Sequence, residues 1–108
     1  MMALASTSLS FLYLLEGDLE NATNYSDMAL KYDKFNPKAW VNKGNCYFKR
    51  NNFLKAKESY LEAIGIEVDC VEALYNLAFV NKKIGLYEEA LTALERLRPI
   101  VNSPEVLF

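Results

Sequence analysis

The sequence predicts an all-α protein, a right-handed α-solenoid in which three helix-turn-helix units supply six helices. Three observations support this prediction. The chain aligns with itself at an offset of 34 residues without a gap, its apolar residues recur at steps of three and four instead of alternating, and Gly or Asn occupies the same turn position in every unit. A helical hairpin of this size cannot bury its apolar face alone, so we expect each unit to pack against the next.

The 34-residue period appears as columns of similar residues. One column contains only alanine, and a second contains only small residues, as a close approach of two helices requires. A third column holds a large apolar residue in two of its three units. In that order the columns are Ala22, Ala56 and Ala90; Ser10, Gly44 and Ala78; and Ser6, Trp40 and Leu74. Further columns are Ala29, Ala63 and Leu97; Leu19, Phe53 and Tyr87; and Tyr32, Ile66 and Ile100.

The turns inside the units lie one period apart. Gly17, Asn51 and Gly85 share a column, and the end of a helix favours a residue there that tolerates a positive φ angle. The turns and the apolar spacing together define where the helices begin and end. We expect helices at about 4–16, 19–34, 37–50, 53–67, 71–84 and 87–100.

Capping residues support the expected helix starts. Asn36-Pro37 and Ser103-Pro104 each place a capping side chain before a proline at the first helical position, where the missing N–H costs nothing. Asp69 and Glu72 have the spacing of a capping box. These residues predict helices that begin near positions 37, 71 and 104.

Composition argues against several classes of function. The 108 residues carry a net charge of −2 without a long run of like charge, so no surface suited to nucleic acid or an anionic membrane is expected. No stretch reaches the roughly 18 consecutive apolar residues of a transmembrane helix. We therefore expect one compact unit in the cytoplasm, with neither nucleic acid nor membrane as a partner.

The sequence also argues against an enzyme. It contains no His, which is the most frequent general base and metal ligand near neutral pH. Its two cysteines, Cys46 and Cys70, match no metal or redox spacing and are interpreted as reduced packing residues. We expect no catalytic residues, no cofactor and no metal.

The second unit resembles the tetratricopeptide repeat, and the third unit follows the same pattern less closely because Asn81 stands where an aromatic residue is usual. The resemblance implies repeats at 3–36, 37–70 and 71–104, with 105–108 as the start of a truncated next helix. It also implies a protein-interaction scaffold. The residues that carry it, expected to act in packing, are Trp40, Gly44, Tyr47, Ala56, Tyr60, Ala63, Leu74, Ala78 and Ala90.

A narrower resemblance concerns three strings, which begin at Leu9, Asn42 and Cys70 and read LSFLY, NKGN and CVEALYNL. They are similar to the central repeats of a tetratricopeptide subunit of the intraflagellar transport B particle. This resemblance implies a role in assembly of the cilium or flagellum, a location there and at the basal body, and other subunits of that particle as partners. The alternative is a general peptide-binding tetratricopeptide adaptor in the cytosol.

In the family, the inner groove is lined mainly by the first helix of each unit. Carried over by register, the candidate partner-binding residues are Val41, Asn45, Phe48, Tyr75, Phe79, Lys82 and Lys83, with Thr7, Phe11 and Leu14 in the first unit. For Phe48 and Phe79 both partner binding and packing between helices stay open, whereas Phe11 and Leu14 are expected in the core. The uncapped ends of the solenoid further predict self-association of the chain.

The resemblance also disfavours one activity. Members that bind chaperone tails hold a terminal carboxylate with Lys and Asn in the first repeat, Asn in the second, and Lys and Arg in the third. The corresponding positions here are Thr7, Phe11, Asn42, Glu72 and Asn76. Only Asn42 matches, so tight binding of a chaperone C-terminus is not expected.

Overall fold

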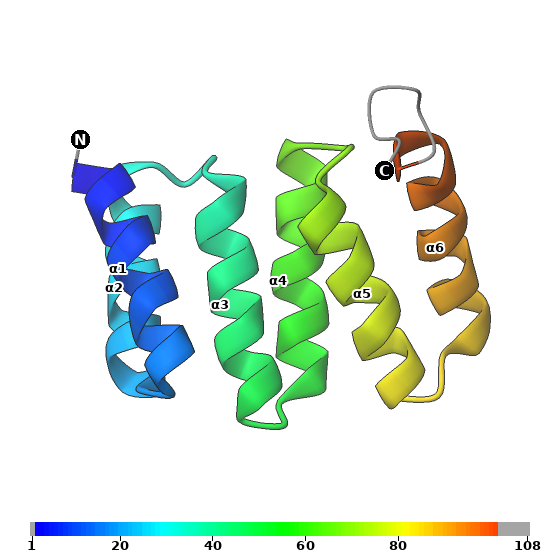
Figure 1. Cartoon of the computed structure of the whole chain (residues 1–108), viewed down its shortest axis with the longest axis horizontal. Helices are drawn as coiled ribbons and strands as arrows, with labels where there is room; N and C mark the ends of the chain where they lie inside the picture. Colours follow the sequence, from blue (N-terminus) through cyan, green and yellow to red (C-terminus); the bar gives the residue numbers. More distant parts are fainter. Residues whose placement is uncertain (1, 102–108) are drawn as a thin grey trace.

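A computed structural model describes residues 2–101 of the chain, and it shows six helices that follow one another along a solenoid (Figure 1). Within this range no residue forms a strand. The observed helix ends lie within two residues of the expected ones, and the all-α solenoid is confirmed. The helices are α1 (Met2–Glu16), α2 (Leu19–Tyr32), α3 (Pro37–Lys49), α4 (Phe53–Ile66), α5 (Val71–Lys83) and α6 (Tyr87–Val101).

Successive helices pair into three hairpins, α1 with α2, α3 with α4, and α5 with α6. Neighbouring hairpins meet where α3 packs on α2 and α5 packs on α4, and the first helices of adjacent hairpins also touch, α1 with α3 and α3 with α5. The middle hairpin is thus covered on both sides, whereas within residues 2–101 the first and third hairpins each contact one other hairpin. Among the described residues, no helix combines the length and apolarity needed to cross a bilayer.

The turns inside the hairpins use the same backbone hydrogen bonds at each period. The amide of residue 18, 52 or 86 donates to the carbonyl oxygen five positions earlier, at 2.8 to 2.9 Å. The preceding residue has a positive φ angle, 84° at Gly17, 62° at Asn51 and 85° at Gly85. This is the helix-ending geometry that the sequence predicts for these positions. A residue in the left-handed conformation turns the backbone so that the next amide can bond to a carbonyl of the last helical turn.

The capping predictions meet different outcomes. The side chain of Asn36 accepts hydrogen bonds from the amides of Lys38 and Ala39, so this cap is confirmed. Helix α5 begins at Val71 as expected, but the capping box at Asp69 is wrong, because the N-cap is Cys70 and makes no side-chain capping bond. Ser103-Pro104 and the expected helix at 105–108 lie outside the described residues.

The core follows the columns of small and apolar residues. Ala56, Tyr60, Ala63, Leu74 and Ala78 are almost completely buried in one cluster that joins the second and third hairpins. The alanines at positions 22 and 90 are also buried. Trp40 and Tyr47 are half-buried and pack against the edge of this cluster. The columns that repeat every 34 residues in the sequence therefore correspond to positions that are buried in successive hairpins.

Candidate functional site

The main depression on the described surface runs between α5 and α6. It consists of two adjoining hollows of about 610 and 550 Å³, which share Tyr75 of α5 and Leu94 of α6. We call this depression the α5–α6 groove. It is lined by Val71, Glu72, Tyr75, Asn76, Ala78, Phe79, Lys82, Tyr87, Ala90, Leu91, Leu94, Leu97 and Arg98.

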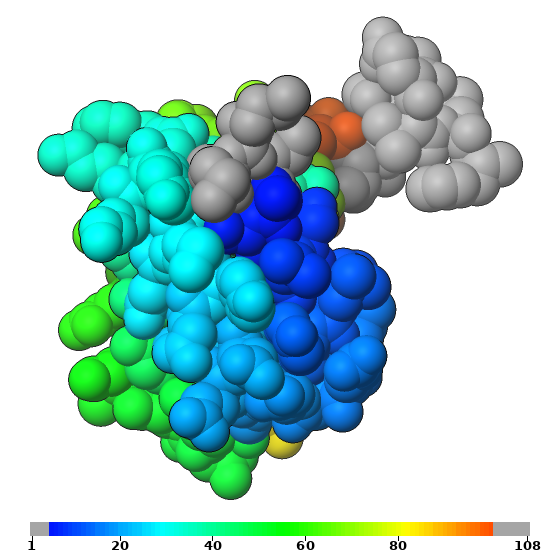
Figure 2. Space-filling view, turned by 90° about the vertical axis from the view of Figure 1, so that its left-hand side faces the viewer, coloured from blue at the N-terminus to red at the C-terminus, as the bar shows by residue number. Residues whose placement is uncertain are grey.

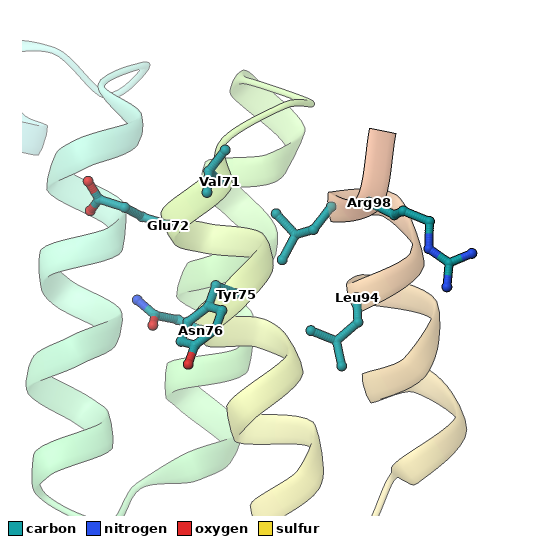
Figure 3. Close-up of a pocket in the computed structure, with 7 residues that line it drawn as sticks. Val71, Glu72, Tyr75, Asn76, Leu94 and Arg98 are labelled. Atoms are coloured by element: carbon teal, nitrogen blue, oxygen red, sulfur yellow. The ribbon is translucent and has the colours of Figure 1, made fainter. Parts of the chain in front are cut away.

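The floor of the α5–α6 groove is apolar and its charges lie at the rim. Figure 3 shows Leu94 directed toward α5, whereas Glu72 extends from the opposite side of α5 and the guanidinium of Arg98 points away from the gap. Tyr75 is 57% exposed and Leu94 is 45% exposed, although both are large and largely apolar. Such a surface suits contact with an apolar protein segment better than contact with a charged ligand.

The structure places four of the predicted groove residues on the third hairpin. Tyr75, Phe79 and Lys82 line the α5–α6 groove, and all three are exposed. Lys83 is exposed in the last turn of α5 but does not line the groove. The first helix of this hairpin thus presents a continuous row of candidate residues to the groove.

The candidates on the second hairpin lie elsewhere. Val41 is 1% exposed and belongs to the core cluster, so its assignment to an exposed groove is wrong. The physical reason is that Val41 belongs to one cluster with buried residues of the following helices, among them Tyr60 of α4 and Leu74 of α5. Asn45 is half-buried, and its Oδ1 accepts hydrogen bonds from the hydroxyl of Tyr60 and, at 3.2 Å, from Nδ2 of Asn76. Asn45 therefore links neighbouring hairpins.

Phe48 joins two hairpins through its ring. Its centroid lies 5.2 Å from that of Phe53, edge to face, and 5.7 Å from that of Phe79. Phe48 is half-buried, so packing between helices is its main role in this structure, whereas Phe79 is 46% exposed and also faces the groove. Of the two interpretations left open by the sequence, packing between helices applies to Phe48, whereas Phe79 is also accessible for partner binding.

On the first hairpin, one expectation of burial holds and one does not. Leu14 is 6% exposed and packs with Ala22 and Cys46, as expected for a core residue. Phe11 is 50% exposed, so its assignment to the core is wrong. Thr7 is buried, and its backbone oxygen accepts a hydrogen bond of 3.2 Å from Nδ2 of Asn42.

The sequence interpretation missed the residues that α6 contributes to the groove. Leu91 is 60% exposed and Leu94 is 45% exposed, and Tyr87 completes this side. The family-based assignment covered only the first helix of each unit. A usable signal was present in the sequence, because Leu94 shares a column with Tyr60, one of the residues that carry the repeat pattern.

Four of the five carboxylate-clamp positions line a second hollow of about 410 Å³ between the first helices of the hairpins, whereas the fifth, Asn76, lines the α5–α6 groove. Its lining includes Phe11, Lys38, Asn42 and Glu72. The amide of Asn42 is engaged with the first hairpin, and Glu72 brings a negative charge where a carboxylate would have to sit. The hollow therefore lacks the concentration of positive charge that a terminal carboxylate needs.

The two thiols are poorly suited to reactivity. Burial raises the pKa of the Cys46 thiol, and burial also raises the pKa of the Cys70 thiol. A thiol is nucleophilic as the thiolate, so raised pKa values keep both groups protonated near neutral pH. Residues 2–101 contain no cluster of three His, Cys, Asp or Glu side chains placed to hold a metal ion.

Relatives of known sequence match parts of the chain. TPR repeat-containing protein MJ1428 of Methanocaldococcus jannaschii is 36% identical over 64 residues, which cover 59% of this chain and 11% of that protein. Protein O-mannosyl-transferase TMTC3 of Homo sapiens is 33% identical over 76 residues, covering 70% of this chain and 8% of that protein. The chain thus spans about a tenth of the length of these relatives.

Solved structures share the fold. The complex of the TPR2B domain of yeast Sti1 with pHsp70 superposes with a TM-score of 0.91 at 20% identity and covers 97% of this chain and 84% of that domain. The second TPR of Spaghetti (RPAP3), bound to the HSP90 peptide SRMEEVD, superposes with a TM-score of 0.85 at 18% identity and covers 90% of each chain. At these identities the similarity shows the fold alone.

One family model matches most of the chain. The match extends over residues 16–97, from the end of α1 to the last buried residue of α6, and its description is "Anaphase-promoting complex, cyclosome, subunit 3". Together with the period of 34 residues, the repeated turn geometry and the superposed structures, this match defines the family. The chain belongs to the anaphase-promoting complex, cyclosome, subunit 3 family, and hence to the tetratricopeptide-repeat proteins.

Proposed function

We propose that this chain acts as a protein-interaction scaffold and that a protein partner binds in the α5–α6 groove. The observation that carries the proposal is the row of exposed apolar side chains along the groove, with Tyr75, Phe79, Leu91 and Leu94 each 45% exposed or more. Large apolar side chains that stay accessible in a concave surface are typical of protein-binding sites. Tyr75 and Phe79 are the expected anchors, because aromatic residues dominate such interfaces.

The chemistry of the groove favours a partner segment that is apolar and nearly neutral. The charged side chains at its rim are of both signs, with Glu72 and Lys82 on α5 and Arg98 on α6. Opposite charges at the rim contribute to orientation more than to affinity.

Two features of the relatives support a scaffold. The family takes its name from a subunit of a multiprotein complex, and similar structures are those of domains bound to peptides from HSP90 and Hsp70. A cytoplasmic adaptor that binds peptides is therefore the alternative form of the proposal. The name of TMTC3 describes a whole protein of which this chain matches 8%, so it adds no activity to the proposal.

A photo-crosslinking amino acid at position 75 tests the proposal in the cell that makes the protein. We expect it to form a covalent adduct with another protein, because Tyr75 would lie under the bound partner. The same crosslinker at Leu54, which is 67% exposed on α4 and outside the groove, is the control and is expected to form no such adduct. Equal labelling at both positions, or at neither, would count against the groove as the binding site.

We further propose that the scaffold belongs to the intraflagellar transport B particle. The proposal is supported by the resemblance of the strings that begin at Leu9, Asn42 and Cys70 to polaris, a tetratricopeptide subunit of that particle. It predicts partners among the other subunits and a location in the cilium or flagellum and at the basal body. A location elsewhere in the cytoplasm belongs to the adaptor alternative.

Calorimetric titration against purified subunits of the particle tests this narrower proposal. A Tyr75→Ala/Phe79→Ala variant should lose binding to the subunit that the unmodified chain binds. Phe35→Ala is the control, since Phe35 is 67% exposed in the turn between α2 and α3, away from the groove. If no subunit binds and the full-length protein stays out of cilia and basal bodies, the assignment to the particle fails.

A further inference from the structure

A second surface of α5 and α6, which shares no residue with the α5–α6 groove, borders a hollow of about 370 Å³. We call it the α4–α6 hollow, because α4 and α6 border it and α5, which lies between them in Figure 1, contributes buried residues at its floor. The second and third hairpins define it together, and the structure describes both. It is lined by Lys57, Leu61, Leu77, Asn81, Glu89, Thr92, Ala93 and Arg96.

The same hollow occurs one period earlier, on the middle hairpin. It measures about 320 Å³, and all of its lining residues except Trp40 lie 34 positions before residues that line the α4–α6 hollow. The middle hairpin packs against a hairpin on each side, and its hollow is open nevertheless. This surface is therefore accessible in a hairpin whose neighbours are both present.

The three hairpins differ in the aromatic rings that they place at this position. In the first hairpin Tyr13 and Tyr25 stack, with their ring centroids 5.5 Å apart. Figure 2 looks onto this hairpin and shows α1 in dark blue and α2 in lighter blue side by side. The corresponding pairs in the second and third hairpins are Tyr47 with Ser59, and Asn81 with Ala93. The third hairpin thus has neither ring, and the α4–α6 hollow lies where they would be.

Asn81 leaves a hydrogen-bond acceptor unused at the floor of the α4–α6 hollow. It lines the hollow and is 1% exposed, and its Oδ1 has no hydrogen-bond partner among the described residues. A buried carbonyl oxygen without a partner costs free energy, which a donor from a bound ligand would recover. The terminal torsion of an asparagine side chain is broad, so the oxygen can turn toward a donor that enters the hollow.

The charged side chains around the α4–α6 hollow are engaged with the protein itself. Nζ of Lys57 lies 2.6 Å from Oε2 of Glu89, and this ion pair connects α4 with α6. The guanidinium of Arg96 donates to the backbone oxygen of Val68 at 3.4 Å. Leu61, which is 46% exposed, adds apolar surface at the border. A neutral, largely apolar group with one hydrogen-bond donor therefore complements this hollow better than a charged group does.

We propose that the α4–α6 hollow receives a tyrosine side chain of a protein partner, and that the tyrosine hydroxyl donates to Oδ1 of Asn81. The ring would take the place that corresponds to Tyr47 in the second hairpin. A tyrosine that enters from the surface brings its hydroxyl to the buried floor first, where the free acceptor lies. The inference goes beyond the proposed function, because a partner in the α5–α6 groove contacts none of the residues that line this hollow.

NMR titration with two blocked amino acids tests the proposal. N-acetyltyrosinamide and N-acetylphenylalaninamide differ only in the hydroxyl group. The tyrosine probe should shift the amide signals of Leu77, Asn81 and Ala93 saturably. It should bind at least about fivefold more tightly than the phenylalanine probe, because it forms one additional hydrogen bond to a buried acceptor. Equal binding of the two probes, or shifts confined to Tyr75 and Leu94 in the α5–α6 groove, would overturn the proposal.

Two substitutions at Asn81 separate the space for the ring from the hydrogen bond. Asn81→Tyr supplies the ring that the other hairpins have and should abolish binding in the hollow. Asn81→Leu keeps a side chain of similar size but removes the acceptor, so the two probes should then bind equally. A leucine variant that still prefers the tyrosine probe would count against Asn81 as the acceptor.

The control is Asn24→Tyr, because Asn24 is exposed on α2 and does not line the hollow. This variant should bind the tyrosine probe like the unmodified chain, and circular dichroism verifies that all variants are folded. Phenol serves as a further probe, since it carries the same ring and hydroxyl without a backbone. If phenol shifts the signals of Leu77 and Ala93 and the blocked tyrosine does not, the hollow accepts a free small molecule and the partner tyrosine is excluded.

Discussion

The ring of Tyr60 in α4 lies against the backbone of Gly44 in α3. A Cβ atom added to Gly44 would come within 2.5 Å of Cε1 of Tyr60 and within 2.8 Å of Cδ1. Tyr60 is 1% exposed and its hydroxyl donates to Asn45, so the ring cannot move without the loss of packing and of a hydrogen bond. This contact determines how closely α3 and α4 approach.

Gly44→Ala is therefore expected to lower the free energy of unfolding by about 1–3 kcal/mol, because overpacking outweighs the gain in helix propensity. Urea unfolding followed by circular dichroism measures the change. Gly65→Ala is the matched control, since Gly65 lies in α4 and no atom is found within 4 Å of its added Cβ. This control should be neutral or stabilising by up to about 1 kcal/mol, and equal effects of both substitutions would contradict the tight contact.

Among the described residues, Asn51 is the one non-glycine residue with a positive φ angle, which is 62°. Asn51→Gly should preserve or slightly raise stability, because glycine adopts this conformation without a steric penalty. Asn51→Val should lower the free energy of unfolding by about 1–2 kcal/mol, since left-handed backbone crowds its Cβ. Thermal unfolding of both variants checks the order, and a valine variant as stable as the glycine variant would show that the turn adopts another conformation.

The stability of the chain should fall at alkaline pH. Burial, with a smaller contribution from the Cys46 thiol, raises the pKa of Tyr60 above its ordinary value of 10.0. Above pH 10.0 the unfolded chain loses this proton while the folded chain retains it, so the folded state binds more protons and stability decreases as pH rises. For this one group the decrease is at most about 1.4 kcal/mol per pH unit, and below that pH the contribution is fully present.

Urea unfolding across this alkaline range measures the effect, with Tyr60→Phe as the comparison. The variant lacks the titrating hydroxyl and its hydrogen bond to Asn45, so it should be about 0.5–1.5 kcal/mol less stable at neutral pH. Above pH 10.0 its free energy of unfolding should fall less steeply with pH than that of the unmodified chain. The raised pKa of Cys46 adds a decrease of the same sign from about pH 9.0 in both proteins. Parallel curves would exclude a role for Tyr60.

Asn81 is the buried polar residue that the sequence marks as unusual for its position. It is 1% exposed, and its Oδ1 has no hydrogen-bond partner among the described residues. Asn81→Leu should raise the free energy of unfolding by about 1–2 kcal/mol, because a buried unpaired carbonyl is removed. Calorimetric unfolding measures the gain.

Asn45→Leu is the contrasting substitution for that experiment. The Oδ1 of Asn45 accepts hydrogen bonds from Tyr60 and Asn76, so its loss leaves two donors without their partner. This variant should be destabilised by about 1–3 kcal/mol. If Asn81→Leu is destabilised to a similar extent, the amide of Asn81 has a partner, such as an ordered water molecule.

The HSP90 peptide SRMEEVD, which binds the second TPR of Spaghetti, should give no saturable heat with this chain. The reason is that Glu72 lines the clamp hollow and the amide of Asn42 donates to Thr7. A variant with Phe11→Asn, Glu72→Lys and Asn76→Arg replaces three of the mismatched positions and should bind the peptide measurably. Tight binding by the unmodified chain would show that another surface holds the carboxylate.

The sequence by itself determined the features that depend on neighbours within one hairpin. The period, the turn column with Gly17, Asn51 and Gly85, and the cap at Asn36 are local, because backbone geometry and short-range hydrogen bonds decide them. Whether a neighbouring hairpin covers a given position is not a local property, because it depends on residues outside that position's own hairpin. For this reason Val41 and Tyr75, which share a column, were assigned to the same surface although one is buried and the other exposed.

Only the tertiary structure decided which member of each column remains accessible. Phe11 was expected in the core but is half-exposed, because it lines the hollow between the first helices, just as Phe79 in the same column lines the α5–α6 groove. Leu94 was not among the predicted site residues but lines the groove, because no hairpin in the described part of the chain covers α6 there. In a solenoid the burial of a side chain depends on the neighbouring hairpin as much as on its own, so exposure at the ends follows from stacking and not from residue type.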